Sequence, residues 1–133
     1  DLTAPLFADP NEINTFLPAS FFPDNGNNKL NVNFRLTEGA VVTVNIYEAN
    51  NGSLVKELSR NSYLDDGSGI VQVGDPNDAS PDAILWDGSI GEDGSNIYAA
   101  PGIYTFRIWV RDFAANLYEQ YPITRDIEIT DTP

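Results

Sequence analysis

Apolar and polar residues alternate along most of the chain, a pattern that predicts half-buried β-strands. Residues 29–36 and 102–110 alternate most regularly, with an apolar side chain at every second position. Further strands are predicted at 40–49, 53–58, 70–73, 83–86 and 121–130. A short helix over 55–64 is an alternative to the strand at 53–58, because the apolar residues there fit neither period.

Turn-forming residues separate these segments and indicate the class of fold. Residues 50–53, Asn-Asn-Gly-Ser, predict a hairpin with a type I′ turn, since Asn-Gly tolerates positive φ angles. Two stretches rich in Asp, Gly, Pro and Ser, at 65–69 and 75–81, predict loops. Arg125 shares the apolar face of the last predicted strand, which indicates a bulge, an edge strand or a place at the rim of the core. Short strands without a convincing long helix predict an all-β, antiparallel β-sandwich of about seven or eight strands.

The length of the chain, 133 residues, indicates a single domain over 1–133. Residues 1–12 are rich in proline and polar side chains, so we expect them to anchor weakly, as a linker or as an N-terminal arm for strand exchange. The apolar segment 13–22 could then pair with an exposed sheet edge, its own or a neighbour's. The chain starts at Asp1 without Met, which indicates a processed protein or a piece of a longer one.

The composition excludes several classes of chemistry. Seven Lys and Arg stand against 20 Asp and Glu, a formal charge of −13, which makes nucleic acids and anionic membranes poor partners and suits an extracellular or cell-surface setting. The sequence contains no Cys and no His, so disulfides, the usual zinc sites and Ser-His-Asp or Cys-His catalysis are excluded. No apolar run approaches the roughly 18 residues of a membrane span. Only carboxylates could carry catalysis, and nothing marks a glycosidase pair among them, so we do not expect an enzyme.

Three segments carry motifs in a recognisable order. Residues 18–58 contain Phe-Phe-Pro-Asp-Asn-Gly and the hairpin motif Val-Thr-Val-Asn-Ile-Tyr, residues 84–88 read Ile-Leu-Trp-Asp-Gly, and residues 100–110 contain Gly-Ile-Tyr. Together they resemble the immunoglobulin-like domain of flagellar hook-capping proteins, a type also found in secreted and surface bacterial proteins. The chain departs from that pattern in a longer insert at 64–82. The resemblance implies an immunoglobulin- or fibronectin-III-like sandwich in an extracellular or cell-surface bacterial protein.

The two ends of the chain carry a second resemblance. Asp-Leu-Thr-Ala-Pro at 1–5 is similar to the opening of bacterial immunoglobulin-like repeats, and Arg-Asp-Phe-Ala-Ala-Asn at 111–116 is similar to one of their turns. Residues 131–133 read Asp-Thr-Pro, so both ends carry an Asp followed by a Pro. This resemblance implies one unit of a tandem array or head-to-tail polymer, whose partners are neighbouring copies or adjacent immunoglobulin-like domains.

The Trp-Asp-Gly stretch has a structural interpretation. Trp86 would fill the core, Asp87 would cap the turn, and Gly88 would supply a backbone angle that other residues resist. Gly102 would then lead into Tyr104, a buried tyrosine whose hydroxyl bonds to the backbone.

The alternative for this stretch and its neighbours is a calcium site made of hard oxygen ligands. The candidate ligands are Asp65, Asp66, Asp75, Asn77, Asp78, Asp82, Asp87, Glu92 and Asp93. None of these segments has the spacing of an EF-hand, so the acidic loops would have to cluster at one end of the sandwich to bind calcium.

Trp109 lies opposite the expected core face of its strand, between Arg107 and Arg111 at two-residue intervals. One interpretation is a cross-strand stack of the guanidinium groups on the indole or on a neighbouring tyrosine. A second is a contact surface for a neighbouring copy. A third is a flat aromatic platform for the sugar rings of a polysaccharide, which Tyr118 and Tyr121 would extend.

Two hypotheses of function follow from these patterns. The first is a non-catalytic extracellular structural module, either a subunit of a surface appendage or filament or a spacer in a multidomain surface protein, in the manner of adhesion proteins. The alternative is a carbohydrate-binding accessory module of a secreted enzyme. No cofactor is expected in either case, apart from calcium if the acidic loops bind it.

Overall fold

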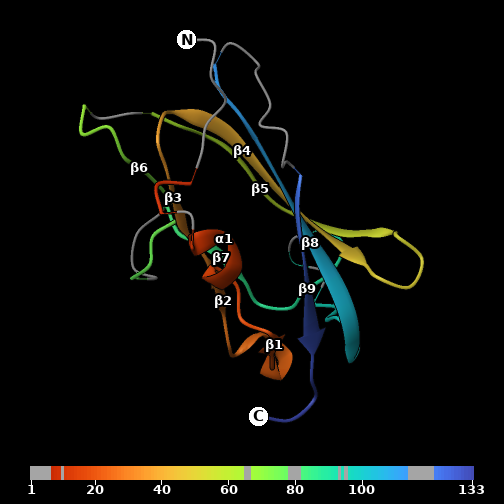
Figure 1. Cartoon of the computed structure of the whole chain (residues 1–133). Helices are drawn as coiled ribbons and strands as arrows, with labels where there is room; N and C mark the ends of the chain where they lie inside the picture. The colour runs from red at the N-terminus through yellow and green to blue at the C-terminus, as the bar shows by residue number, and fades with distance from the viewer. Residues whose placement is uncertain are drawn as a thin grey trace.

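The structure is a computed structural model that describes residues 7–9, 11–64, 67–77, 82–92, 94, 96–113 and 122–133 (Figure 1). A short helix, α1 (Glu12–Thr15), and a turn, η1 (Asp24–Gly26), come early in the chain. The strands are β1 (Ser20–Phe21), β2 (Leu30–Val32), β3 (Phe34–Leu36), β4 (Ala40–Glu48), β5 (Leu54–Tyr63), β6 (Val71–Val73), β7 (Ile84–Trp86), β8 (Gly102–Arg111) and β9 (Ile123–Ile129). The predicted all-β class is therefore confirmed.

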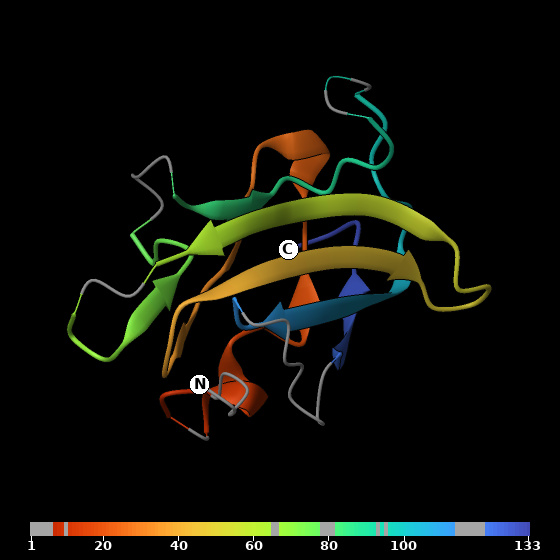
Figure 2. The same ribbon diagram turned by 90° about the horizontal axis from the view of Figure 1, so that it is seen from above.

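The strands form two layers with the core between them. One layer is a five-stranded sheet in the order β1-β9-β8-β4-β5. The other layer consists of two two-stranded sheets, β2-β7 and β3-β6, across from it (Figures 1 and 2). Among the described residues every strand pair is antiparallel except β1 with β9, which is parallel. The fold is thus sandwich-like, and the prediction of a purely antiparallel arrangement is wrong at β1.

The inner faces of the two layers supply the core. In β4, Val42, Val44 and Ile46 are fully buried, and the residues between them are half-buried. From the opposite layer, the ring of Trp86 packs edge-on against Phe106 of β8, with 5.7 Å between ring centres. Each fully buried side chain of this size contributes about 1.5–3 kcal/mol, so the core is the main source of stability.

The regular stretch 29–36 does not form one strand, as its pattern predicts, but two. It breaks at Asn33 into β2, which pairs with β7, and β3, which pairs with β6. The break coincides with Gly74, whose φ is +73° and where any Cβ would collide with the Val32 carbonyl oxygen. β6 ends at Val73 and β7 begins at Ile84, so two separate strands, of which only β6 lies in the insert, pair with this one stretch of chain. This break and the short β1 raise the strands of the described residues to nine, against seven or eight predicted.

The hairpin between β4 and β5 is confirmed, but its predicted turn type is wrong. Gly52 has a φ of +71°, whereas Asn51 is not among the residues with positive φ, and a type I′ turn needs both. The loop closes instead through the amide of Glu48, which donates to the carbonyl of Ser53 at 2.9 Å. The helix considered for 55–64 does not form, because β5 pairs with β4 along its length.

Arg125 of β9 and Phe7 near the N-terminus both lie next to the core. Arg125 is half-buried opposite Phe106, and β1 pairs with β9 only beyond it, at 128 and 129, so the expected edge or rim position is confirmed. Phe7, within the predicted N-terminal arm, bridges to Leu36 and stacks on the ring of Phe34 at 4.9 Å. The rest of the arm before Phe7 lies outside the described residues.

Candidate functional site

The Trp-Asp-Gly turn is built around a buried indole. Trp86 is only 1% exposed, and its indole N–H donates to the carbonyl oxygen of Ser89 at 2.8 Å. The amide of Ser89 in turn donates to a carboxylate oxygen of Asp87 at 2.9 Å. The tryptophan therefore satisfies its one donor within the turn that follows it, which lets a large polar-tipped ring be buried at low cost.

Gly88 allows this turn to lie directly against a segment far away in the sequence. Its φ is +87°, and a Cβ at this position would lie 2.5 Å from the Cβ of Pro23. A second close approach lies beside it, where a Cβ on Gly26 would be 2.8 Å from the hydroxyl of Tyr98. The amide of Ala99 donates to the carbonyl of Gly88 at 2.8 Å and joins the two sides. Both glycines are required by close packing and by backbone angle.

The turn η1 stores backbone strain at the same end of the molecule. Asp24 and Asn25 both have φ of +52°, and Gly26 follows at +88°. Consecutive non-glycine residues in this region are uncommon, and each costs of order 1–3 kcal/mol. The packing of Tyr98 and of the Trp-Asp-Gly turn holds this conformation in place.

An open pocket of about 400 Å³ lies beside the strained turn. Its lining combines aromatic or proline walls with carboxylate, amide and hydroxyl groups: Phe22, Pro23, Asp24, Asn25, Tyr98, Ala99, Pro101, Thr130 and Asp131. Such a lining can stack on a ring and accept hydrogen bonds from hydroxyl groups. Sequence reasoning missed this pocket. The Pro-Asp-Asn-Gly turn was visible in the sequence, but its proximity to the C-terminal residues depends on the parallel pairing of β1 with β9.

Tyr104 lies next to the same core. It is 7% exposed, and its hydroxyl donates to the carbonyl of Ala100 at 2.8 Å. Burial raises the pKa of Tyr104 above its usual value, and the nearby charge of Glu48 raises it further. Gly102 precedes it with a φ of +153° and open space around its Cβ position.

Asp87 is engaged in the turn rather than free for a cation. Burial raises the pKa of Asp87, but the hydrogen bonds from Ser89 and the charge of Lys29 lower it more, so the pKa lies below its usual range. Lys29, Lys56, Asp87 and Ser89 also line a common pocket of about 280 Å³. Two ammonium groups in this pocket disfavour a calcium ion at Asp87.

The remaining candidate calcium ligands are dispersed or undescribed. Asp65, Asp66, Asp78 and Asp93 lie outside the described residues. The carboxylate of Asp75 accepts a hydrogen bond from the amide of Asn77 at 2.8 Å, while Asp82 and Glu92 are exposed. Within the described part of the chain, no three acidic side chains come together in a way that could hold a metal ion.

A second surface of interest is the outer face, by which we mean the side chains of β4, β5, β8 and β9 that point away from the core. Trp109 lies on it, half-buried and opposite Thr43. The guanidinium carbon of Arg107 lies 4.5 Å from the ring centre of Tyr47, which is a cation–π stack. Arg111 is exposed at the end of the same strand. The tyrosines expected to extend this surface, Tyr118 and Tyr121, lie outside the described residues.

Comparison with known sequences adds no family. Within the described ranges, no helix is long and apolar enough to span a membrane. No protein-family model matches the chain, and no curated protein matches it either.

Proposed function

We propose that the chain is an immunoglobulin-like β-sandwich that serves as a non-catalytic structural module of an extracellular or cell-surface assembly. In this role it contacts neighbouring copies or adjacent domains of its own kind. The observation that carries the proposal is the contact of Gly88 with Pro23. It joins two of the motifs on which the resemblance to the hook-capping type of domain rests, and these motifs are distant in the sequence.

The chemistry of the whole sequence supports a structural role. The 133 residues contain no His and no Cys, which removes two of the most common catalytic side chains. The best placed of these, Asp87, is held by hydrogen bonds within its own turn. The formal charge of −13 keeps such a surface well solvated and suits exposure to salt outside the cell.

A second candidate function, a carbohydrate-binding accessory module, is favoured by the pocket beside η1. Its aromatic walls, Phe22 and Tyr98, and its acceptors, Asp24 and Asp131, are of the kinds that stack on sugar rings and bind their hydroxyl groups. Its volume of about 400 Å³ falls within the range of small-molecule sites.

Particle size and glycan binding together distinguish the two functions. The structural proposal predicts particles that grow beyond the dimer with chain concentration, measured by light scattering with calcium and then with chelator. It also predicts no retention on a panel of immobilised polysaccharides.

The opposite result would favour the carbohydrate-binding module. Saturable binding to one polysaccharide by a chain that never exceeds the dimer would contradict the structural proposal. In that case Asp131→Ala, in the pocket lining, should weaken binding, while Glu92→Ala, exposed elsewhere, should not.

A further inference from the structure

The side chains of the outer face do not pack in the core, yet several of them are apolar, which is unusual for the solvent-facing side of a sheet. An antiparallel sheet with one wet face normally alternates apolar inside and polar outside. Here Val41 and Tyr47 of β4 and Trp109 of β8 point outward and are half-buried, and Ile103 of β8 is 44% exposed. A face that carries aliphatic and aromatic side chains between short polar ones is suited to being covered by another surface.

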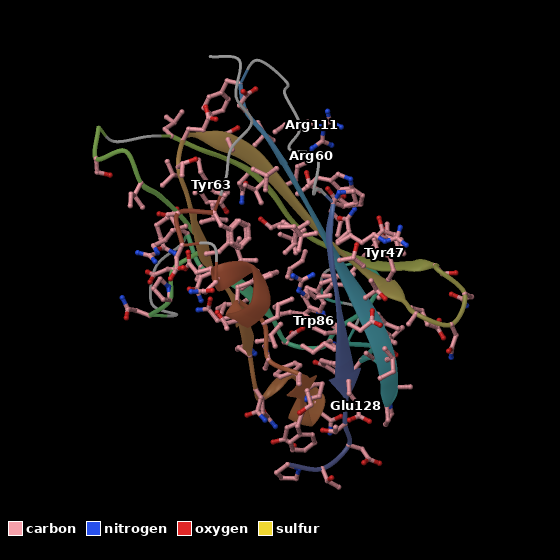
Figure 3. The ribbon with its side chains drawn as sticks, in the orientation of Figure 1. Tyr47, Arg60, Tyr63, Trp86, Arg111 and Glu128 are labelled. Atoms are coloured by element: carbon pink, nitrogen blue, oxygen red, sulfur yellow. The ribbon has the colours of Figure 1, made fainter. Side chains whose placement is uncertain are left out.

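The charges on the outer face are separated along the strands. Arg60, opposite Thr43, and Arg111, opposite Val41, project at one end. Asp126 and Glu128 of β9 project at the other end, as Figure 3 shows for Arg60, Arg111 and Glu128. The outer face therefore has a basic end and an acidic end.

Among the described residues, the arginines of this face have no carboxylate partner. Arg60, Arg107 and Arg111 are three of only seven Lys and Arg in a chain with 20 Asp and Glu. Nevertheless, within the described residues none of the three takes part in an ion pair. Their immediate neighbours on β4 are uncharged, and Glu57, an exposed carboxylate of β5 on the same face, lies farther along the strands, opposite Asn45.

The middle of the face carries an unsatisfied acceptor. Asn45 and Arg107 lie directly opposite each other on β4 and β8. The side-chain amide nitrogen of Asn45 donates to the hydroxyl of Tyr47 at 3.2 Å, but its oxygen is buried without a hydrogen-bond partner in the described structure. A buried acceptor left unpaired destabilises the fold, so this row is a poorly satisfied part of the sheet.

We propose that the outer face binds the same face of a second copy of the chain, around a two-fold axis that lies between the two sheets and runs across the strands near Arg107. This axis places the end with Arg60 and Arg111 of one copy over the end with Asp126 and Glu128 of the other. Symmetry forms the reverse contact at the same time. The outward aromatic and aliphatic side chains are then buried between sheets about 10 Å apart, while each Arg107 keeps its stack on Tyr47 of its own copy.

A second copy fits this surface better than an anionic polymer does. A polyanion would be attracted by the basic end but repelled by Asp126 and Glu128 and by the formal charge of −13. The second copy complements both ends and supplies apolar surface as well. The pairing goes beyond the proposed function, because a closed two-fold pair can form whether the chain is a structural module or a carbohydrate-binding one.

Charge exchange between the two ends tests the pairing. Sedimentation equilibrium of the wild-type chain over a concentration series should show a reversible dimer that weakens as salt is raised. Arg111→Glu alone and Glu128→Lys alone should each weaken self-association by about tenfold or more, since each change creates two like-charge contacts in a symmetric dimer. An equimolar mixture of the two variants should restore dimers, because every altered contact is again between opposite charges.

The control is Lys29→Glu, an exposed residue of the other layer that changes the net charge as much as Arg111→Glu does and should leave the dimer unchanged. Far-UV circular dichroism and thermal unfolding of each variant show that the fold is retained. A monomeric wild-type chain, dimers unaffected by either variant, or variants whose mixture fails to dimerise would each overturn the proposal. A different result would assign the face to a polyanion instead. In that case the wild-type chain would be monomeric and would be retained on immobilised polygalacturonate, and Arg111→Glu would abolish the retention.

Discussion

The two tryptophans of the chain lie in opposite surroundings. Trp86 is 1% exposed between the layers, where its ring packs against Phe106 and its N–H bonds to Ser89. Trp109 is half-buried on the outer face, in the row of Thr43. Both residues come from strands with clear alternation, yet one holds the two layers together and the other covers a sheet from outside.

The difference shows that the same residue type can serve in the core or on the surface of this chain. What distinguishes the two positions is how far the side chain is buried and whether the polar groups around it have hydrogen-bond or ion-pair partners. Around Trp86, the indole N–H donates to Ser89, and the amide of Ser89 donates to Asp87, so these donors are satisfied within the turn. On the outer face, by contrast, the oxygen of Asn45 has no hydrogen bond and Arg111 has no ion pair within the described residues. The Trp86 turn satisfies these donors within one copy, whereas the outer face carries an exposed Arg111 that a partner's carboxylate can pair with.

The largest expected difference in stability is between the truncations of the two tryptophans. Trp86→Ala should lower the free energy of unfolding by about 3–5 kcal/mol, because it leaves a large cavity in a close-packed core. Trp109→Ala should cost about 1 kcal/mol or less in the monomer, since the ring is only half-buried. Chemical denaturation monitored by circular dichroism measures both, and equal losses would contradict the proposed difference between the two sites.

The close approach of the Trp-Asp-Gly turn to Pro23 is tested by two glycine substitutions. Gly91→Ala places a Cβ in open space at a φ of +78°, so it should cost only backbone strain, about 1–2 kcal/mol. Gly88→Ala has a similar φ, +87°, but adds a collision with Pro23, which should cost about 1–3 kcal/mol more. Denaturation midpoints compare the two variants, and equal destabilisation would show that the turn yields to the added methyl group.

The smallest expected effect concerns the charge of Asp87 and its dependence on pH. Its folded pKa is lower than the unfolded value of 3.8, so the ionised carboxylate stabilises the fold above that pH. This contribution is lost as the pH falls through the folded pKa. Asp87→Asn should therefore cost about 1 kcal/mol at pH 7 and less at about pH 3, below the unfolded pKa. Unfolding measured at both values decides this, since an undiminished difference at low pH would mean that the charge is not responsible.

Much of the fold could be predicted because alternation and burial coincide in the long strands. In β4 and β8, the side chains predicted to face inward are buried, and of the outward positions of β8 only Thr105 is buried as well. The positions of Trp86 and Tyr104 in the core follow the same rule. The type of the turn at Gly52 could not be predicted reliably, because the loop is set by the register of β4 and β5 and not by the Asn-Gly pair alone.

The candidate site was less accessible to prediction. The motif around Trp86 could be recognised from the sequence. The alternation along the strand of Trp109 also showed that its side chain points away from the core. The pocket beside η1 could not, because Asp24 and Asp131 come from distant segments. The separation of charge on the outer face could not either, since Arg60 and Asp126 belong to strands whose neighbours are known only from the sheet order.

The sequence by itself determined the all-β class, the inward faces of the strands and the acidic, His- and Cys-free surface chemistry, because these depend on local periodicity and composition. Only the tertiary structure decided the break at Asn33, the contact of Gly88 with Pro23 and the basic and acidic ends of the outer face. These features depend on which distant segments pair and in which register. Register is set by the combined packing of the whole core, which no local stretch of sequence contains.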